Sequence, residues 1–130
     1  MIRPVKRRAT PEADIQRQIV ATLRAVLPKG SVVHHSANEI TGCGELARNR
    51  QAILVGMGVH AGFSDLLVLS EGRALFLEVK SKTGRLQPSQ EAFRDLVTAQ
   101  GFAWALVRSV DDALGALAQH GFRTRIAGAP

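Results

Sequence analysis

Two carboxylates and one ammonium group stand at spacings that could bring them together in the folded chain. Asp65 precedes an apolar run at residues 66–69, and Glu78 and Lys80 lie at the end of a second run at residues 74–80. Two apolar runs joined by a short polar turn predict a β-hairpin. Residues two apart on a strand share a face, so Glu78 and Lys80 are expected to point the same way.

The register of this hairpin decides whether Asp65 joins the other two. If Glu71 and Gly72 are the two central residues of the turn, Asp65 lies directly opposite Glu78. Directly opposed side chains share a face and lie about 5 Å apart at Cβ. A register shifted by one residue sends Asp65 to the other face instead. In a further alternative the hairpin forms an edge, where Glu78 and Lys80 face water and pair with each other.

A cluster of this kind indicates a metal site. Two carboxylates so close together repel, and each raises the proton affinity of the other. A divalent cation removes the repulsion, and hard oxygen ligands suit Mg²⁺ or Mn²⁺. Phe76, Leu77 and Val79 surround the charged residues in the sequence, and charge on so apolar a strand calls for a reason.

Two more polar residues fall on apolar faces of expected helices. Glu12 lies three and seven residues before Ile15 and Ile19, so it either supports a site or interacts with the helix dipole as an acidic residue of the first turn. Gln90 lies three residues before Phe93, so it points inward or along the edge of the buried face, or else it is a surface residue.

The elements that must position these residues follow from hydrophobic periodicity and turn signals. A helix opens with Thr10 as its N-cap and ends at residues 28–30, and it is followed by a strand at 31–35, a helix at 45–55, the hairpin, a helix at 88–100, a strand at 102–107 and a helix at 110–120. In the helix at 45–55, Leu46, Ile53 and Leu54 should point inward. The order α-β-α-β-β-α-β-α predicts an α/β domain with a mixed central β-sheet flanked by helices.

The charge of the chain indicates a polyanionic partner. Its 130 residues carry 17 Lys+Arg against 11 Asp+Glu, a net charge of +6. Thirteen of the cations are Arg, which binds phosphate through two nitrogens. A basic soluble protein without such a partner is the alternative. The candidate phosphate contacts, each also compatible with a solvated surface cation, are Arg48, Arg50, Lys82, Arg85 and the basic arm.

Composition disfavours other classes of protein. No apolar run is long enough to span a bilayer, and no signal-peptide core follows the basic N-terminus, so we expect a cytoplasmic protein. Cys43, the single cysteine, allows no internal disulfide and no cysteine-based zinc site, and nothing around it indicates a low-pKa nucleophile. His34 and His35 lack a matching third metal ligand.

Together these residues resemble the VRR-NUC domain of the PD-(D/E)XK nuclease superfamily. The resemblance runs from about Glu12 to His120 and includes the Asn38-Glu39 segment. An Asp followed by Glu-x-Lys is weakly specific. The two segments at residues 84–90 and 107–112 make the match specific. The segments that carry it are Gly62-Phe63-Ser64-Asp65-Leu66-Leu67, Leu77-Glu78-Val79-Lys80-Ser81-Lys82, Gly84-Arg85-Leu86-Gln87-Pro88-Ser89-Gln90 and Val107-Arg108-Ser109-Val110-Asp111-Asp112.

The resemblance implies a restriction-endonuclease-like core and hydrolysis of DNA phosphodiester bonds. Lys80 would orient or deprotonate the attacking water and stabilise the developing charge, and Gln90 would contribute to the site from its helix. The metal ligands that the resemblance implies are Asp65, Glu78, the Val79 carbonyl and, directly or through water, Glu12.

Stand-alone members of this size are viral or bacterial and, like Holliday-junction resolvases, act on branched DNA as dimers. The expected function is therefore a Mg²⁺- or Mn²⁺-dependent DNA endonuclease of DNA repair. It would be a homodimer that selects branched DNA such as four-way junctions, in the cytoplasm of a bacterial cell or phage-infected host. The alternatives are a nuclease of flaps or ordinary duplex, and a DNA-binding module without catalysis.

Two residues depart from the family pattern. Ser64 replaces the proline expected before the aspartate. That proline shapes the turn and does no chemistry. Gln87 stands where a Ser or Thr cap is expected before Pro88, and this weakens the expected helix start that positions Gln90. The expected regions are a basic flexible arm at residues 1–10, the nuclease domain at 11–120 and a C-terminal tail at 121–130.

Overall fold

The computed structural model describes residues 10–37 and 44–125. Residues 1–9 of the expected basic arm, residues 126–130 of the expected tail, Asn38, Glu39 and Cys43 lie outside the described residues. None of the described helices is long and apolar enough to cross a membrane. The elements form in the expected order: α1 (Pro11–Val26), β1 (Val32–His35), α2 (Glu45–Gly56), β2 (Leu66–Ser70), β3 (Arg73–Val79), α3 (Pro88–Ala99), β4 (Ala103–Val107) and α4 (Val110–Gln119).

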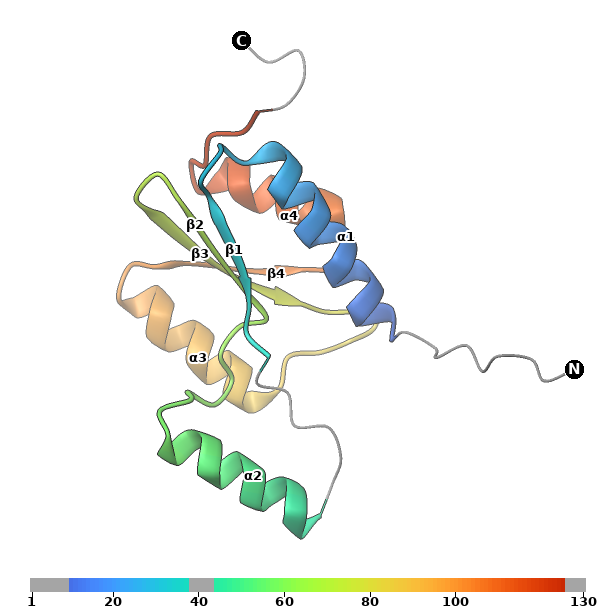
Figure 1. Ribbon diagram of the computed structural model, residues 1–130, viewed down its shortest axis with the longest axis vertical. Coiled ribbons are helices and arrows are strands. Elements are labelled where there is room, and N and C mark those ends of the chain that lie inside the picture. The colour runs from blue at the N-terminus through green and yellow to red at the C-terminus, as the bar shows by residue number, and fades with distance from the viewer. Residues whose placement is uncertain (1–9, 38–43, 126–130) are drawn as a thin grey trace, which may run out of the picture.

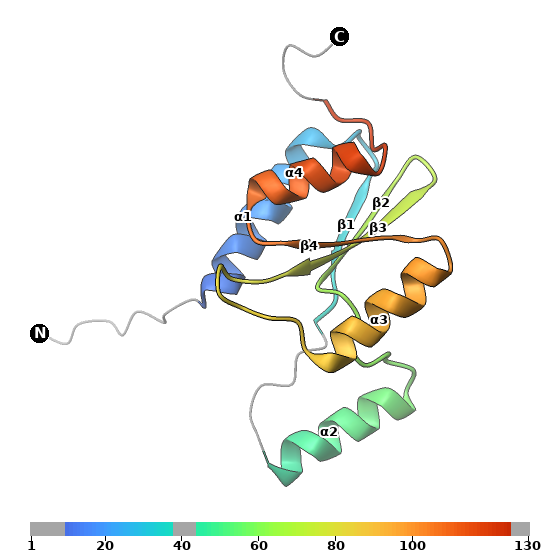
Figure 2. The same cartoon turned by 180° about the vertical axis from the view of Figure 1, so that it is seen from behind.

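The strands form one mixed sheet with helices on both faces, so the predicted α/β architecture is confirmed. The strand order is β1-β2-β3-β4, with β3 and β4 parallel and the other neighbours antiparallel. α1 and α4 cover one face and α3 lies on the other (Figure 1, Figure 2). Because successive side chains of a strand alternate, Leu75 and Leu77 enter the core under α1 and α4, while Phe76 packs against Phe93 of α3.

The hairpin of β2 and β3 has the register that aligns the candidate residues. Glu71 and Gly72 both have positive φ, 50° and 77°, as a two-residue turn of type I′ requires. Leu66 pairs with Leu77, and one step further along the same register places Asp65 opposite Glu78. The shifted register is wrong because Leu66 pairs with Leu77, and the edge hairpin is wrong because β3 lies between two strands of the described sheet.

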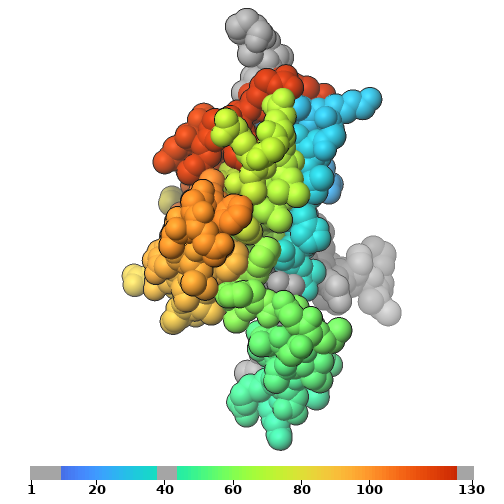
Figure 3. Space-filling model, turned by 90° about the vertical axis from the view of Figure 1, so that its left-hand side faces the viewer, coloured from blue at the N-terminus to red at the C-terminus, as the bar shows by residue number. Residues whose placement is uncertain are grey.

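The predicted packing of α2 is wrong. Leu46 and Ile53 were expected to point inward but are 68% and 61% exposed, and Leu54 is only half-buried. In the space-filling view α2 projects beyond the body of the domain (Figure 3). Hydrophobic periodicity identifies the apolar face of a helix but does not say what covers it.

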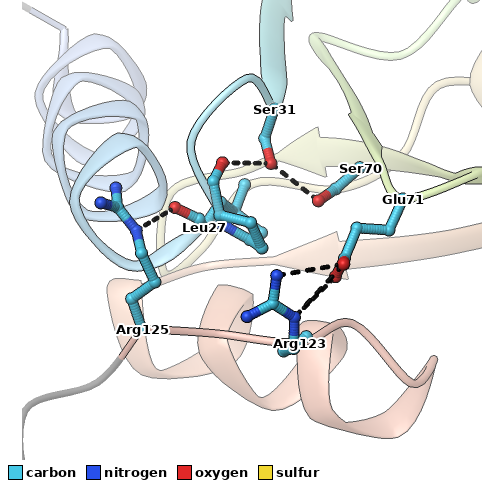
Figure 4. A network of polar contacts seen from close by, with 7 residues as sticks. Leu27, Ser31, Ser70, Glu71, Arg123 and Arg125 are labelled. Atoms are coloured by element: carbon cyan, nitrogen blue, oxygen red, sulfur yellow. Dashed lines mark hydrogen bonds and ion pairs between the residues drawn. The ribbon is translucent and has the colours of Figure 1, made fainter.

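The far end of the sheet is tied together by polar contacts (Figure 4). Arg123 donates to Glu71 at 3.0 Å in the hairpin turn, and Arg125 Nε donates to the Leu27 carbonyl at 2.7 Å. The hydroxyls of Ser31 and Ser70 lie 2.7 Å apart. The described start of the expected tail is therefore attached to the domain, at the end opposite the candidate site.

Candidate active site

The candidate residues meet at the open end of the hairpin, where the end of β3 lies near the first turns of α1 and α3 (Figure 1, Figure 2). Asp65, Glu78 and Lys80 are 9%, 1% and 7% exposed. Lys80 continues the line of β3, since its backbone N–H donates to the Val107 carbonyl of β4 at 3.0 Å. Two carboxylates and the stem of one lysine are thus buried on one face of the sheet, where β2 begins and β3 ends.

Asp65 is held from both neighbouring strands. Its Oδ2 accepts a hydrogen bond from the Val79 N–H at 2.8 Å. Its backbone carbonyl accepts from the Ser36 N–H at 2.9 Å and lies 3.1 Å from His35 Nδ1. The sequence did not predict this contact for His35. Only the pairing of β1 with β2, which sets His35 opposite Leu66, reveals it.

Gln90 fixes the position of Glu78. Its Nε2 donates to Glu78 Oε1 at 2.8 Å, and its own Oε1 accepts from the Gln87 N–H at 2.8 Å. Both ends of the Gln90 amide are therefore engaged, and the side chain points inward from α3. This bond also closes the first turn of α3, so the lack of a Ser or Thr cap at Gln87 does not loosen the helix start, contrary to expectation.

The environment of Glu78 favours its protonated form. Burial, together with the charges of Asp65 and Glu12, raises the pKa of Glu78 from 4.5 to about 9, against the opposing charge of Lys80. Glu78 Oε2 is buried without a hydrogen-bond partner among the described residues. A buried polar atom in that state is costly, so this position calls for a proton or a cation.

The donor set fits a hard divalent cation. Such an ion would bind the unpartnered oxygen of Glu78 and cancel the repulsion with Asp65. Across residues 10–37 and 44–125, no three His, Cys, Asp or Glu side chains are grouped closely enough to hold an ion. The side chains therefore supply two carboxylates, and a backbone oxygen such as the Val79 carbonyl would have to add to them.

Glu12 and Lys80 complete the surroundings of the pair. Glu12 lies in the first turn of α1, and its Oε1 lies 3.0 Å from the point where a Cβ on Gly84 would be. The ammonium group of Lys80 forms no hydrogen bond or ion pair in the part of the chain that the structure describes. That group is therefore available to an anionic substrate.

The four predicted phosphate contacts are all exposed. Lys82 and Arg85 follow Lys80 in the loop before α3, and Arg48 and Arg50 lie on α2. Each can reach solvent and hence a nucleic-acid backbone.

Ser64, which stands in place of the expected proline, has a buried hydroxyl without a partner among the described residues. Because an unpaired buried hydroxyl does not stabilise the fold, Ser64→Ala should leave the free energy of unfolding unchanged or raise it by up to about 1 kcal/mol. Ser70→Ala, which removes a buried hydroxyl bonded to Ser31, should lower it by about 1 kcal/mol. Urea denaturation compares the two, and a loss of stability in Ser64→Ala would contradict the prediction.

Comparisons with known proteins identify the family of the chain. The model of the VRR-NUC domain family matches residues 12–111. A solved structure described as a VRR_NUC domain protein has a TM-score of 0.66, 20% sequence identity and coverage of 88% of this chain and 90% of that chain. No curated protein sequence matches the chain.

The class of protein is therefore a nuclease of the PD-(D/E)XK superfamily. Within that class, the chain belongs to the VRR-NUC domain family. DNA is the substrate that such a nuclease domain implies.

Proposed function

We propose that this protein is a Mg²⁺- or Mn²⁺-dependent endonuclease that hydrolyses phosphodiester bonds in branched DNA such as four-way junctions. One observation supports the metal dependence above all. The fully buried Glu78 keeps one oxygen without a partner, beside a second carboxylate and a buried lysine stem. A cation is the partner that this arrangement accepts together with a phosphate.

Each residue has a distinct part in the proposal. Asp65, Glu78 and the Val79 carbonyl would hold the ion, whose chemistry is to lower the pKa of a bound water and to neutralise charge on the phosphate. Lys80 binds the scissile phosphate, orients or deprotonates the attacking water, and supplies a fixed positive charge where negative charge develops. Gln90 keeps Glu78 in place through the bond from its amide.

The remaining residues act at the border of the site. Glu12 would support the ion through water from the first turn of α1, because among the described residues it is not grouped with Asp65 and Glu78 closely enough to bind the same ion directly. Lys82, Arg85, Arg48 and Arg50 bind DNA phosphates, which fixes the DNA without reading its sequence and makes affinity depend on salt.

Branch selectivity and a homodimer are proposed from the likeness to stand-alone members of the family. A four-way junction has two strands to cut, whereas each chain supplies one site, so two copies would act together. Junction cleavage would place the protein in DNA repair. Light scattering at the concentration used for cleavage should give the mass of two chains; a monomeric mass for the active species would contradict this part.

One cleavage assay tests the proposal. Linear duplex, flap and four-way junction DNA of matched sequence are incubated with the protein and Mg²⁺, Mn²⁺ or EDTA, in parallel with Glu78→Ala. The junction should be cut fastest, only with metal, and not by the variant. Equal cleavage of all three would replace branch selectivity by a general duplex activity. Binding without cleavage would leave a DNA-binding module, and cleavage in EDTA would reject the metal-dependent mechanism.

A further inference from the structure

Arg108, directly after β4, forms hydrogen bonds to the loop that follows Lys80. Its Nη1 donates to the carbonyl of Ser81 at 2.5 Å and to the carbonyl of Gly84 at 2.7 Å. The Gly84 N–H in turn bonds back to Ser81, to the carbonyl and to the hydroxyl, each at 3.1 Å. One guanidinium nitrogen thus closes the turn at residues 81–84 from the neighbouring strand.

The backbone of Arg108 is itself fixed. Its N–H donates to Asp112 Oδ2 at 2.9 Å, and the Asp112 N–H donates to Ser109 Oγ at 3.0 Å, which closes the first turn of α4. On the other side, the carbonyl of Val107 accepts the Lys80 N–H. Arg108 therefore joins a rigid helix start to the loop, and a change confined to its side chain leaves these backbone contacts in place.

The loop that Arg108 binds, residues 81–84, borders the candidate active site at both ends. Lys80 immediately precedes it, and Gly84 lies against the Glu12 carboxylate, since a Cβ added at Gly84 would lie only 3.0 Å from Glu12 Oε1. A shift of this loop would therefore move Lys80 and Glu12 relative to Asp65 and Glu78. Small displacements of that kind weaken catalysis strongly.

We propose that Arg108 is a positioning residue: by holding the carbonyls of Ser81 and Gly84, it sets Lys80 and Glu12 around the two carboxylates. The inference rests on the proposed nuclease activity. The Arg108 guanidinium donates to the protein's own backbone. Among the described residues it has no carboxylate partner. A positively charged residue beside a nuclease site could alternatively bind DNA phosphate, and the test separates the two roles.

The kinetic test compares Arg108→Ala, Arg108→Lys and a matched control, Arg123→Ala, on four-way junction DNA. Arg123 also carries one positive charge, but it pairs with Glu71 at the far end of the sheet. Arg108→Ala should lose about 10- to 100-fold in kcat, with KM unchanged. Arg108→Lys should restore part of the loss in kcat, because a single nitrogen of Arg108 makes the bonds to both carbonyls. The control should behave as wild type.

A second variant reaches the same loop without touching Arg108. Gly84→Ala places a methyl group against Glu12 Oε1, so it should lower kcat as Arg108→Ala does, with the melting temperature of both variants near that of wild type. The opposite result is weaker DNA binding by Arg108→Ala, with a slope of log affinity against log salt concentration that is smaller in magnitude by about 0.9. That result would make Arg108 a phosphate contact and overturn the proposal.

Two readouts do not need cleavage. Without metal or DNA, the Gly84 amide should exchange its hydrogen severalfold faster in Arg108→Ala than in wild type or Arg123→Ala. Added Mn²⁺ should raise Tm less in Arg108→Ala than in the control. If the wild-type protein cuts no DNA, the proposed function fails while these readouts still decide on Arg108. Unchanged Gly84 exchange, or a freed loop with unchanged kcat and Mn²⁺ response, would refute the positioning role.

Discussion

Glu78→Gln should abolish DNA cleavage and at the same time stabilise the metal-free protein. Glutamine keeps the acceptor that Gln90 bonds, and its amide nitrogen can donate toward Asp65 where Glu78 needs a proton. It carries no charge to hold a cation, so cleavage should fall by at least about 1000-fold, or about 4 kcal/mol of transition-state stabilisation. Loss of cleavage together with a gain in the free energy of unfolding is the combined result that we expect.

The stability gain has a defined pH dependence. In the folded protein Glu78 keeps its proton up to about 9, whereas an ordinary glutamate loses it near 4.5. Between these values the folded chain binds one proton more than the unfolded chain, so the free energy of unfolding of wild type falls as pH rises, by at most about 1.4 kcal/mol per pH unit. Glutamine does not titrate, so the advantage of Glu78→Gln should grow across this window and level off above it.

Urea denaturation in EDTA, at several pH values within the window, measures this advantage. Glu91→Gln is the matched control, because Glu91 is an exposed carboxylate on the first turn of α3, and it should follow the wild-type pH dependence. Equal pH dependence of wild type and Glu78→Gln, or a less stable Glu78→Gln, would contradict the account of the buried pair.

Lys80→Ala should lose turnover while keeping Mn²⁺ binding. Removal of a fixed cation from the position where charge develops should lower kcat by about 100- to 1000-fold. Two effects on the ion oppose each other: the loss of Lys80 removes repulsion of a cation, but it also removes the charge that lowers the pKa of Glu78. Mn²⁺ affinity should therefore change little.

Single-turnover cleavage and Mn²⁺ calorimetry separate the two properties. Lys80→Met keeps most of the buried aliphatic stem and should behave as Lys80→Ala, which excludes a packing defect. Lys29→Ala removes an exposed lysine at the far end of the sheet and should leave both properties unchanged. A variant at Lys80 that loses Mn²⁺ affinity while kcat at saturating metal is kept would show that Lys80 supports the ion and not the reaction.

The hairpin was predictable because its signals are local. Glu71 and Gly72 suit a two-residue turn, the register follows from the turn, and the register aligns Asp65 with Glu78. Helical spacing before Phe93 allowed an inward position of Gln90 beside a surface position, and the bond to Glu78 decides for the inward one. In each case the residue that sets the geometry lies within one or two elements of the residue that it positions.

The contacts that sequence reasoning missed join elements far apart in the chain. Arg108 bonds a loop 24 residues earlier, and the described contact of His35 with Asp65 spans 30 residues. Neither has a periodicity or a motif spacing that predicts the partner. The exposed face of α2 was missed for a related reason, since Leu46 and Ile53 have helical spacing whether or not another surface covers them.

Calorimetric titration of Mn²⁺ into wild type and Glu78→Gln, without DNA, tests most directly whether the buried carboxylate pair holds a metal ion. We expect saturable binding to wild type and at least about a 100-fold loss of affinity in the variant, or about 2.7 kcal/mol. Equal binding to both proteins, or no binding to wild type, would contradict this expectation.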